Sequence, residues 1–353
     1  MRDAQAQASW EWAEGLDVRD LLRIPHPASP IALFMTTPLD FDTTGLRGRL
    51  LGHEPMARHV SWRAGGAAAR AYAPRDLADL QLLLQLLPPQ EPVVFVGLGS
   101  NLLVRDGGFA GTVVLMHSPH AAIRLDGEFV FAEAAAASPK VARFAATHGL
   151  EGAEFLAGVP GTVGGALAMN AGCYGSETWE FVARVDTVDR HGRLRARTPA
   201  DFELGYRHVR LKADGGRFAT ERAPPPGAPP AEEWFVSAWF RFPGGDGERA
   251  RRRIKALLAR RIKTQPLALP NAGSVFRNPP GDHAARLIEA CGLKGFAIGG
   301  ARISERHANF IVNPKGGARA ADIEALIEHA RRAVRDRFGV DLTPEVRVIG
   351  ERA

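Results

Sequence analysis

The segment that most restricts the fold is residues 149–175, GLEGAEFLAGVPGTVGGALAMNAGCYG, which holds eight glycines and no lysine or arginine. Glycine has no Cβ atom, so main-chain N–H groups can converge on a ligand and positive φ angles cost little. The central part, residues 159–165, can therefore bind a diphosphate through N–H groups alone, without a cationic side chain. We interpret the segment as a loop that binds a cofactor.

The alternative for a glycine cluster is a set of turns that joins core strands. Apolar residues between the glycines favour burial and a binding function, because idle surface loops are usually polar. These residues are Phe155, Leu156, Val159, Val163, Leu167 and Met169. Asn170 and Tyr174 add polar groups, so the segment suits a flat, partly apolar ligand with a charged tail.

Composition limits the class of protein. The chain has 353 residues, 45% of them hydrophobic, which is enough for two or three domains. Only Cys173 and Cys291 are present, which excludes a disulfide framework and an all-cysteine zinc site, and we expect no metal. No apolar run is long enough to span a bilayer, and acidic residues stand where a signal peptide needs an apolar core. We therefore expect a cytoplasmic protein without membrane insertion.

A second glycine-rich loop is predicted upstream of the first. Strands predicted at 93–96 and 112–116 enclose Gly97-Leu98-Gly99-Ser100-Asn101, which can form a phosphate-binding turn or an ordinary tight turn. The loop lacks the full Gly-x-Gly-x-x-Gly spacing and the acidic residue that follows it in dinucleotide folds, so such a fold is not supported. Two separate loops of this kind favour one extended cofactor held between two domains.

Hydrophobic periodicity and turn residues predict the remaining elements. The predicted strands are two within 59–74, joined by a turn at Gly65 and Gly66, and four at 183–189, 236–242, 308–312 and 342–349. The predicted helices are at 76–87, 249–263 and 321–338, one that is capped by Ser138 and ends before Gly149, and one at 282–290 that is capped by Asp282. Residues 212–233 form a predicted Pro/Gly-rich insertion. The elements after residue 280 predict a compact α/β unit.

The helix at 249–263 carries eight basic residues and no acidic one. With the net charge of +6, this run leaves open a basic nucleic-acid-binding protein. No aromatic residues interleave the run and no recognition motif accompanies it, so we expect no nucleic-acid partner. Most of its charges are predicted to form a solvated face, and Lys263 at the helix end is the one that we place near a phosphate.

Six landmarks now stand in order along the chain. They are SWRAGG at 61–66, GLGSNL at 97–102, GVPGTVGG at 158–165, YR at 206–207, NAGSVFRNP at 271–279 and PEVR at 344–347. In this order they resemble the UDP-N-acetylenolpyruvoylglucosamine reductase family, over roughly residues 54–350. The family reduces the enolpyruvyl group of a UDP-sugar to give UDP-N-acetylmuramate for peptidoglycan.

The resemblance implies an α+β, three-domain flavoprotein. Its FAD-binding fold is of the vanillyl-alcohol-oxidase-like type, with a C-terminal α/β substrate-binding domain. The implied division is an unassigned N-terminal extension at 1–53, FAD-binding subdomains at 54–118 and 119–264 with the insertion at 212–233, a substrate-binding domain at 265–340 and a C-terminal strand at 341–353. The implied cofactors are non-covalent FAD and NADPH as co-substrate, and the implied protein is a cytoplasmic monomer.

The resemblance also implies site residues. The catalytic residues are Arg207, Ser274 and Glu345. The cofactor-binding residues are Gly97, Gly99, Ser100, Asn101, Leu102, Gly161, Thr162, Gly164, Gly165, Asn170 and Gly172. The substrate-binding residues are Tyr206, Lys263, Asn278 and His307. A guanidinium can hold the substrate carboxylate in bidentate fashion, Ser274 would donate the proton, and Glu345 would assist as a neutral acid or within a hydrogen-bond network.

Two departures from the family pattern refine the interpretation. The chain has three tyrosines, none within residues 212–233, so it resembles the subclass that lacks a substrate-closing tyrosine loop. His208-Val209 follows Tyr206-Arg207 where many relatives carry a serine at the second position. The closest rival is an FAD-dependent oxidase of the same fold that acts on an alcohol or lactone. The C-terminal landmarks favour the reductase.

Overall fold

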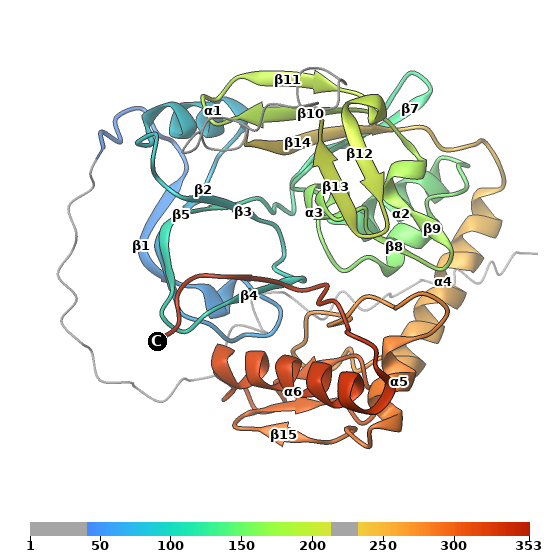
Figure 1. Cartoon of the computed structure of the whole chain (residues 1–353). Helices are drawn as coiled ribbons and strands as arrows, with labels where there is room; N and C mark the ends of the chain where they lie inside the picture. The colour runs from blue at the N-terminus through green and yellow to red at the C-terminus, as the bar shows by residue number, and fades with distance from the viewer. Residues whose placement is uncertain (1–40, 213–231) are drawn as a thin grey trace, which may run out of the picture. The chain divides into compact units, whose positions relative to one another are not determined.

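The computed structural model describes residues 41–212 and 232–353, and its first layer is a four-stranded sheet (Figure 1). The strand order is β1-β2-β5-β3, with β1 antiparallel to β2 and with β2 and β3 parallel to β5. The strands are β1 (Arg49–Pro55), β2 (Ala67–Ala73), β3 (Val93–Val96) and β5 (Phe109–Leu115). Helix α1 (Leu77–Leu86) begins at its N-cap Asp76, which accepts from Asp79 N, and buries Leu80, Leu83 and Leu84.

The predicted strand at the start of residues 59–74 is wrong. Residues 59–62 form turns and a bend there instead, directly after a 3-10 helix, η2 (Met56–Arg58). Trp62 is the physical reason, because its ring is fully buried and its indole Nε1 donates to Ile311 O at 2.7 Å. The chain turns at Arg63, whose φ is +55°, to place that ring in the core of the C-terminal unit. Strand β1 was not predicted, because Gly52 and Pro55 weaken its pattern.

The second layer is a five-stranded antiparallel sheet of order β11-β10-β14-β7-β6. Its strands are β6 (Ile123–Asp126), β7 (Phe129–Glu133), β10 (Val182–Asp189), β11 (Leu194–Arg197) and β14 (Glu233–Phe240). Helices α2 (Ser138–Thr147), α3 (Val163–Ala168) and α4 (Gly247–Thr264) contribute to one core with this sheet. Ala137, not the predicted Ser138, is the N-cap of α2, because Ser138 is helical and its N–H donates to Gly161 O at 3.0 Å.

Short elements join this layer to the candidate site. They are η3 (Glu154–Gly158), β8 (Gly172–Cys173), β9 (Ser176–Glu177), η4 (Thr178–Glu180), η5 (Pro199–Asp201), β12 (Phe202–Gly205) and β13 (His208–Leu211). β8 pairs with β9, and β12 pairs with β13 around the two-residue turn Tyr206-Arg207. Both hairpins face the cavity described below through Gly172 and Arg207. The predicted insertion at 212–233 lies almost entirely outside the described residues, as does most of the predicted extension at 1–53.

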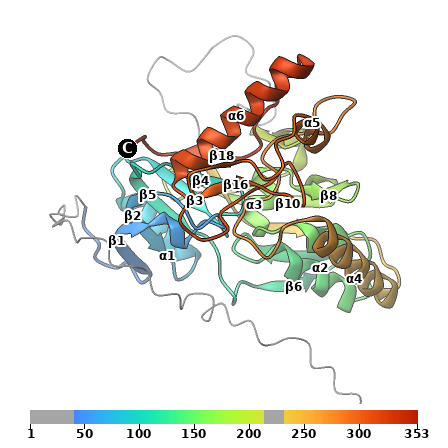
Figure 2. The same cartoon turned by 90° about the horizontal axis from the view of Figure 1, so that it is seen from below.

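The C-terminal unit combines two helices with a small antiparallel sheet of order β15-β16-β17. Its elements are α5 (Ala284–Ala290), β15 (Ala297–Ile298), β16 (Ala301–Ile303), β17 (Ile311–Val312) and α6 (Ala320–Phe338). His283 stands at the N-cap of α5 instead of the predicted Asp282, whose carboxylate binds Arg286. The last strand, β18 (Arg347–Ile349), pairs in parallel with β4 (Leu102–Val104), and Figure 2 labels the two strands next to each other.

This arrangement confirms the predicted α+β class. Among the described residues, no helix is both long enough and apolar enough to cross a bilayer. The pairing of β18 with β4 matters most for the site, because it brings residues just before Arg347 next to the first glycine loop. Arg347 N donates to Asn101 O at 3.0 Å.

Candidate active site

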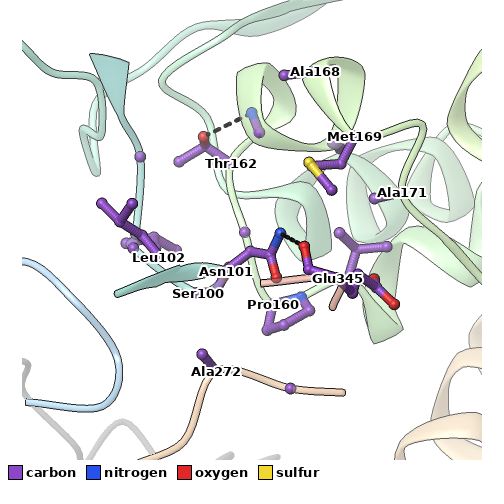
Figure 3. Close-up of a pocket in the computed structure, with 18 of the residues that line it drawn as sticks. Ser100, Asn101, Leu102, Pro160, Thr162, Ala168, Met169, Ala171, Ala272 and Glu345 are labelled. Atoms are coloured by element: carbon purple, nitrogen blue, oxygen red, sulfur yellow. Dashed lines mark hydrogen bonds between the residues drawn. The ribbon is translucent and has the colours of Figure 1, made fainter. Parts of the chain in front are cut away.

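A cavity of about 520 Å³ lies where the two glycine loops meet the C-terminal unit (Figure 3). The loops contribute residues 97–101 and 158–162, and the C-terminal unit contributes Ser274 and Glu345. A second cavity of about 640 Å³ shares Phe95, Gly97, Thr162 and Gly165 with the first and continues toward β14. Both volumes fall in the range of small-molecule and cofactor sites.

Glycine is required where the loops touch. A Cβ at Gly97 would stand 2.3 Å from Thr162 Oγ1, and a Cβ at Gly99 would stand 2.1 Å from His59 O. Gly99 also has a φ of +60°. At Gly161 and Gly165 the nearest atoms to an added Cβ are 3.2 and 3.7 Å away, so there the missing side chain leaves room on the cavity side.

Several main-chain N–H groups in these loops lack partners. Those of Gly99, Ser100, Asn101, Gly161 and Thr162 donate to no acceptor within the described part of the chain, although Gly99 and Thr162 are buried. Buried N–H groups are almost always paired, so these donors indicate a ligand that supplies hydrogen-bond acceptors. Val163 and Gly164 differ, because their N–H groups donate to Ala136 O and Ala134 O.

The guanidinium of Arg207 has three protein partners. Nε donates to Glu345 Oε1 at 2.6 Å, Nη1 to Asn170 O at 3.2 Å and Nη2 to Gly172 O at 2.7 Å. A guanidinium has five N–H bonds. The described residues accept three of these N–H bonds, so Nη1 and Nη2 each keep one N–H without a protein partner. A carboxylate bound in bidentate fashion needs two such N–H bonds.

Glu345 reaches the cavity through the C-terminal segment. Its N–H donates to Val275 O at 2.7 Å. Its main-chain carbonyl accepts from Asn101 Nδ2 at 3.1 Å, and a dashed line marks this bond in Figure 3. Burial raises the pKa of Glu345 above its ordinary value, although the charges of Arg207 and Arg277 oppose that change. A carboxyl group held in this way is less fully ionised than an exposed one.

Ser274 stands on the turn that precedes Val275. Gly273 has a φ of +75°, and its N–H donates to Asn271 Oδ1 at 2.9 Å, so the Asn-Ala-Gly sequence forms the turn that carries the serine. Among the described residues, Ser274 Oγ makes no hydrogen bond, and the residue lines the cavity together with Arg207 and Glu345. The three predicted catalytic residues therefore line one cavity, although they come from three distant parts of the chain.

Most predicted cofactor residues line the same cavity. They are Gly97, Gly99, Ser100, Asn101, Leu102, Gly161, Thr162, Gly165 and Gly172. Gly164 lines only the second cavity, where it packs against Ala134. Asn170 lines neither cavity, because its buried amide is bonded to Glu177, Gly205 and Trp179 and supports Arg207 instead.

The predicted substrate residues lie outside the lining of the first cavity. Tyr206 is exposed next to Arg207, and Lys263 is exposed on α4. Asn278 Oδ1 accepts from Ala284 N at 3.1 Å and so holds the start of α5. His307 Nδ1 is buried without a partner in the described part of the chain, and burial lowers the pKa of this histidine.

Arg261 is the lining residue that sequence reasoning missed. It lies two residues before Lys263, lines the cavity, and has no carboxylate partner among the described residues. Nε donates to Gln265 Oε1 at 2.7 Å, and burial lowers the pKa of the guanidinium. Its position in the sequence indicates that it faces inward, because Arg261 follows Leu257 by four residues and so lies on the apolar face of the helix.

Cys173 is a second lining residue that was not predicted to have a role. Its Sγ donates to Phe155 O at 3.0 Å, and burial raises the pKa of the thiol to about 11. The thiol is therefore protonated at neutral pH and inert as a nucleophile. Within residues 41–212 and 232–353, no group of three or more histidine, cysteine, aspartate or glutamate side chains could hold a metal ion.

Comparisons with known proteins agree with this geometry. A family model described as FAD binding domain matches residues 68–196, and one described as UDP-N-acetylenolpyruvoylglucosamine reductase, C-terminal domain, matches residues 265–349. The chain is 57% identical over 321 residues to the UDP-N-acetylenolpyruvoylglucosamine reductase of Thiobacillus denitrificans, covering 87% of this chain and 94% of that protein. With the enzyme of the same name from Nitrosospira multiformis it is 56% identical over 319 residues, covering 88% and 92%.

A solved structure is also similar. The crystal structure of UDP-N-acetylenolpyruvylglucosamine reductase from Thermus caldophilus matches with a TM-score of 0.68 and 29% sequence identity. The match covers 86% of this chain and 98% of that chain. The similarity therefore extends over most of both chains and is not confined to one domain.

Proposed function

The chain belongs to the UDP-N-acetylenolpyruvoylglucosamine reductase family, and we propose that it reduces the enolpyruvyl group of UDP-N-acetylglucosamine-enolpyruvate to UDP-N-acetylmuramate. The reaction uses FAD and NADPH and supplies a peptidoglycan precursor. The observation that carries this proposal is the meeting of Arg207, Ser274 and Glu345 in the cavity between the two glycine loops. A connection to cell shape and division, a cytoplasmic location and a monomeric state are parts of the same proposal.

The loops fit the phosphate part of FAD. Gly99, Ser100 and Asn101 in one loop and Gly161 and Thr162 in the other have unpaired N–H groups and line the same cavity. Main-chain donors of this kind bind a diphosphate without a cation. The two adjoining cavities provide space for an extended dinucleotide. When bound and reduced by NADPH, FAD supplies a hydride to the enolpyruvyl double bond.

Arg207 binds and polarises the substrate carboxylate. Hydride addition at the terminal carbon of the double bond leaves negative charge on the carbon beside the carboxylate. The two N–H bonds of Arg207 without protein partners would hold that carboxylate and stabilise the charge spread onto it. Glu345 fixes the guanidinium through Nε.

Ser274 would complete the reaction by giving its hydroxyl proton to the carbon beside the carboxylate. A serine hydroxyl is a weak acid, but a carbanion is a far stronger base, so a positioned hydroxyl is sufficient. The Oγ atom has no protein partner among the described residues and so remains available to a substrate in the cavity. Its rigid turn fixes the direction of the transfer.

Arg261 is the cation that we place nearest the substrate diphosphate, since it lines the cavity without a carboxylate partner within residues 41–212 and 232–353. Tyr206 and His307 stay proposed contacts at the margin of the site. Lys263 and Asn278 stay proposed as secondary contacts, which need the substrate to extend beyond the lining of the first cavity.

Flavin spectroscopy on the purified protein tests the function directly. We expect flavin absorbance that bleaches with NADPH under anaerobic conditions and returns on addition of UDP-N-acetylglucosamine-enolpyruvate. NADH at the same concentration measures the nucleotide preference. Rapid oxygen consumption with an alcohol or lactone in the absence of NADPH would identify the oxidase of the same fold. Protein without flavin that binds DNA in a salt-sensitive manner would reject the flavoenzyme altogether.

A further inference from the structure

Asn170 and Glu177 form a polar pair that lies behind Arg207. Asn170 Nδ2 donates to Glu177 Oε2 at 2.7 Å and to Gly205 O at 3.1 Å, and its Oδ1 accepts from Trp179 N at 3.1 Å. Both amide hydrogens and the amide oxygen of Asn170 therefore bind protein groups, and the residue is 4% exposed. The amide is therefore structural and not directed at a ligand.

The main chain of the same residues accepts from Arg207. Asn170 O and Gly172 O receive the two terminal nitrogens of the guanidinium, at 3.2 and 2.7 Å. Glu177 supports both carbonyls, because its side chain binds the Asn170 amide and its main chain pairs with Gly172 in the β8-β9 hairpin. A Cβ at Gly172 would stand 2.9 Å from Glu177 Cγ, so the two residues are in close contact.

Both ends of this connection have unusual backbone angles. Asn170 has a φ of +41° and Arg207 a φ of +54°, a region that favours glycine. Such conformations persist only where surrounding interactions determine them. The Asn170 amide contributes to both, because it is anchored on Glu177 and binds Gly205 O two residues before Arg207, at the start of the turn.

We infer that Asn170 and Glu177 are positioning residues, which set the direction of the Arg207 guanidinium so that its two remaining N–H bonds face the substrate carboxylate. The inference rests on the proposed function. It assigns to Asn170 a role in the reduction of the substrate in place of cofactor binding. Loss of the pair should leave the cofactor loops intact and should displace Arg207, and a displacement of about 1 Å can cost about a hundredfold in rate.

The central variant is Glu177→Ala, with Glu177→Gln as the rescue, since glutamine keeps an oxygen that accepts from Asn170 Nδ2. Glu180→Ala is the matched control, because Glu180 Oε1 accepts from Glu177 N in the same capping box but does not touch Asn170. Asn170→Gly tests the amide itself while keeping a residue that tolerates the positive φ.

Four measurements are made on each holoenzyme: flavin content, Tm, the rate of flavin reduction by NADPH, and the rate of reoxidation by the enolpyruvyl substrate. For Glu177→Ala and Asn170→Gly we expect normal flavin content, flavin reduction within twofold of the wild type, and reoxidation slowed by about tenfold to a hundredfold. Glu177→Gln and Glu180→Ala should stay within threefold. Equal losses in flavin content and both half-reactions would indicate a merely structural role and overturn the inference.

A double-mutant cycle with Arg207→Lys separates positioning from an independent effect. If Glu177 acts through Arg207, Glu177→Ala should slow the Arg207→Lys enzyme by less than twofold, because the orientation that it protects is already lost. Additive losses would overturn the inference. A readout that needs no substrate is the solvent exchange of the Arg207 Nε–H resonance, which should be slow in the wild type and Glu177→Gln and faster in Glu177→Ala.

The exchange measurement also distinguishes the two proposals. If the wild-type flavin is not reoxidised by the enolpyruvyl substrate, the proposed function fails, and the exchange rates alone decide whether Glu177 orients Arg207. If the wild type is reoxidised and Glu177→Ala matches it in both exchange and rate, the positioning role fails while the proposed function stands.

Discussion

Arg207 Nε donates to Glu345 Oε1 at 2.6 Å, a bond between residues 138 positions apart in the chain. It joins the β12-β13 turn to the segment that precedes β18, so the antiparallel sheet layer and the C-terminal segment meet at the cavity. The side chains of Arg207 and Glu345 are 15% and 14% exposed, so the ion pair is largely shielded from water. Glu345 thereby occupies one edge of the guanidinium and leaves the terminal nitrogens to other partners.

Arg207→Lys should separate charge from geometry. Lysine keeps the positive charge but cannot bind Glu345, two carbonyls and a carboxylate in one plane. We expect flavin content to stay normal and the substrate-dependent step to slow by about a hundredfold or more, as for the loss of one charge-stabilising donor. Arg210→Lys is the matched control, since Arg210 is exposed on β13 and pairs with Glu203. A loss of less than threefold in Arg207→Lys would refute the assigned role.

Ser274→Ala should interrupt proton delivery alone. The variant removes one oxygen from a residue whose Oγ has no protein partner among the described residues, so neither the fold nor the cofactor loops depend on it. We expect flavin bleaching by NADPH at the normal rate and substrate reduction slowed by about 10² to 10⁴-fold, the range of general acid catalysis. Stopped-flow absorbance resolves the two steps. Turnover near the wild-type rate would exclude Ser274 as the proton donor.

Strong periodicity made the helices predictable from the sequence. The helices predicted at 76–87, 249–263 and 321–338 are observed as α1, α4 and α6, and no predicted end differs from the observed end by more than two residues. The apolar periodicity of α6 predicts that Ile323, Ile327, Ala330, Val334 and Phe338 face inward. The first four are buried, whereas Phe338, the last residue of the helix, is exposed. Local capping was less predictable, because Ser138 N in α2 donates to the distant Gly161 O, and because the Asp282 carboxylate before α5 binds Arg286.

The resemblance to a known family predicted more of the site than the residue pattern did, and the comparisons confirm the family. No local pattern could place Glu345 beside Arg207, because their contact depends on β18 returning to β4. The residue pattern also gave Asn170 a cofactor role, whereas its amide is buried among protein partners. The charge pattern of the helix at 249–263 predicts a solvated face for most of its basic residues, whereas Arg261 lines the cavity.

The two glycine positions Gly165 and Gly97 should respond differently to alanine. At Gly165 the nearest atom to a new Cβ is 3.7 Å away, and the residue is in helix α3, so alanine should preserve or raise Tm of the apoprotein. The Cβ would enter space that the cofactor needs, so flavin affinity should fall by about tenfold. At Gly97 a Cβ would stand 2.3 Å from Thr162 Oγ1, so both Tm and flavin content should fall.

Fluorescence titration with FAD and thermal unfolding of the apoprotein measure these effects. Gly317→Ala is the control, because a Cβ there meets nothing within 4 Å and the position is not at positive φ. Unchanged flavin affinity in Gly165→Ala would contradict the assignment of this loop to the cofactor.

Arg261 and Lys263 form a matched pair on the same helix. Arg261 lines the cavity, whereas Lys263 is exposed, so only the first should contribute a charge to the substrate diphosphate. We expect Arg261→Met to raise KM for the UDP-sugar by about tenfold or more with a smaller effect on kcat, because the diphosphate is bound in both the ground and transition states. Lys263→Met should change KM by less than threefold. The reverse order would move the diphosphate contact to Lys263.

Glu324 should make stability depend on acid. Arg105 and Arg352 bind its carboxylate and hold its pKa at about 2, below the usual 4.5, so the ionised form is stabilised by folding. A lowered pKa contributes stability above the unfolded value, and that stability is lost as pH falls from about 4.5 toward 2. The ion pairs are partly exposed, so Glu324→Gln should cost about 1 kcal/mol or less at pH 7. In urea unfolding this difference should shrink below pH 4.5, and Glu328→Gln on the same helix, at a more exposed ion pair, is measured alongside as the control. A Glu324→Gln difference that stays constant from pH 7 to pH 3 would show that the arginines do not stabilise the carboxylate.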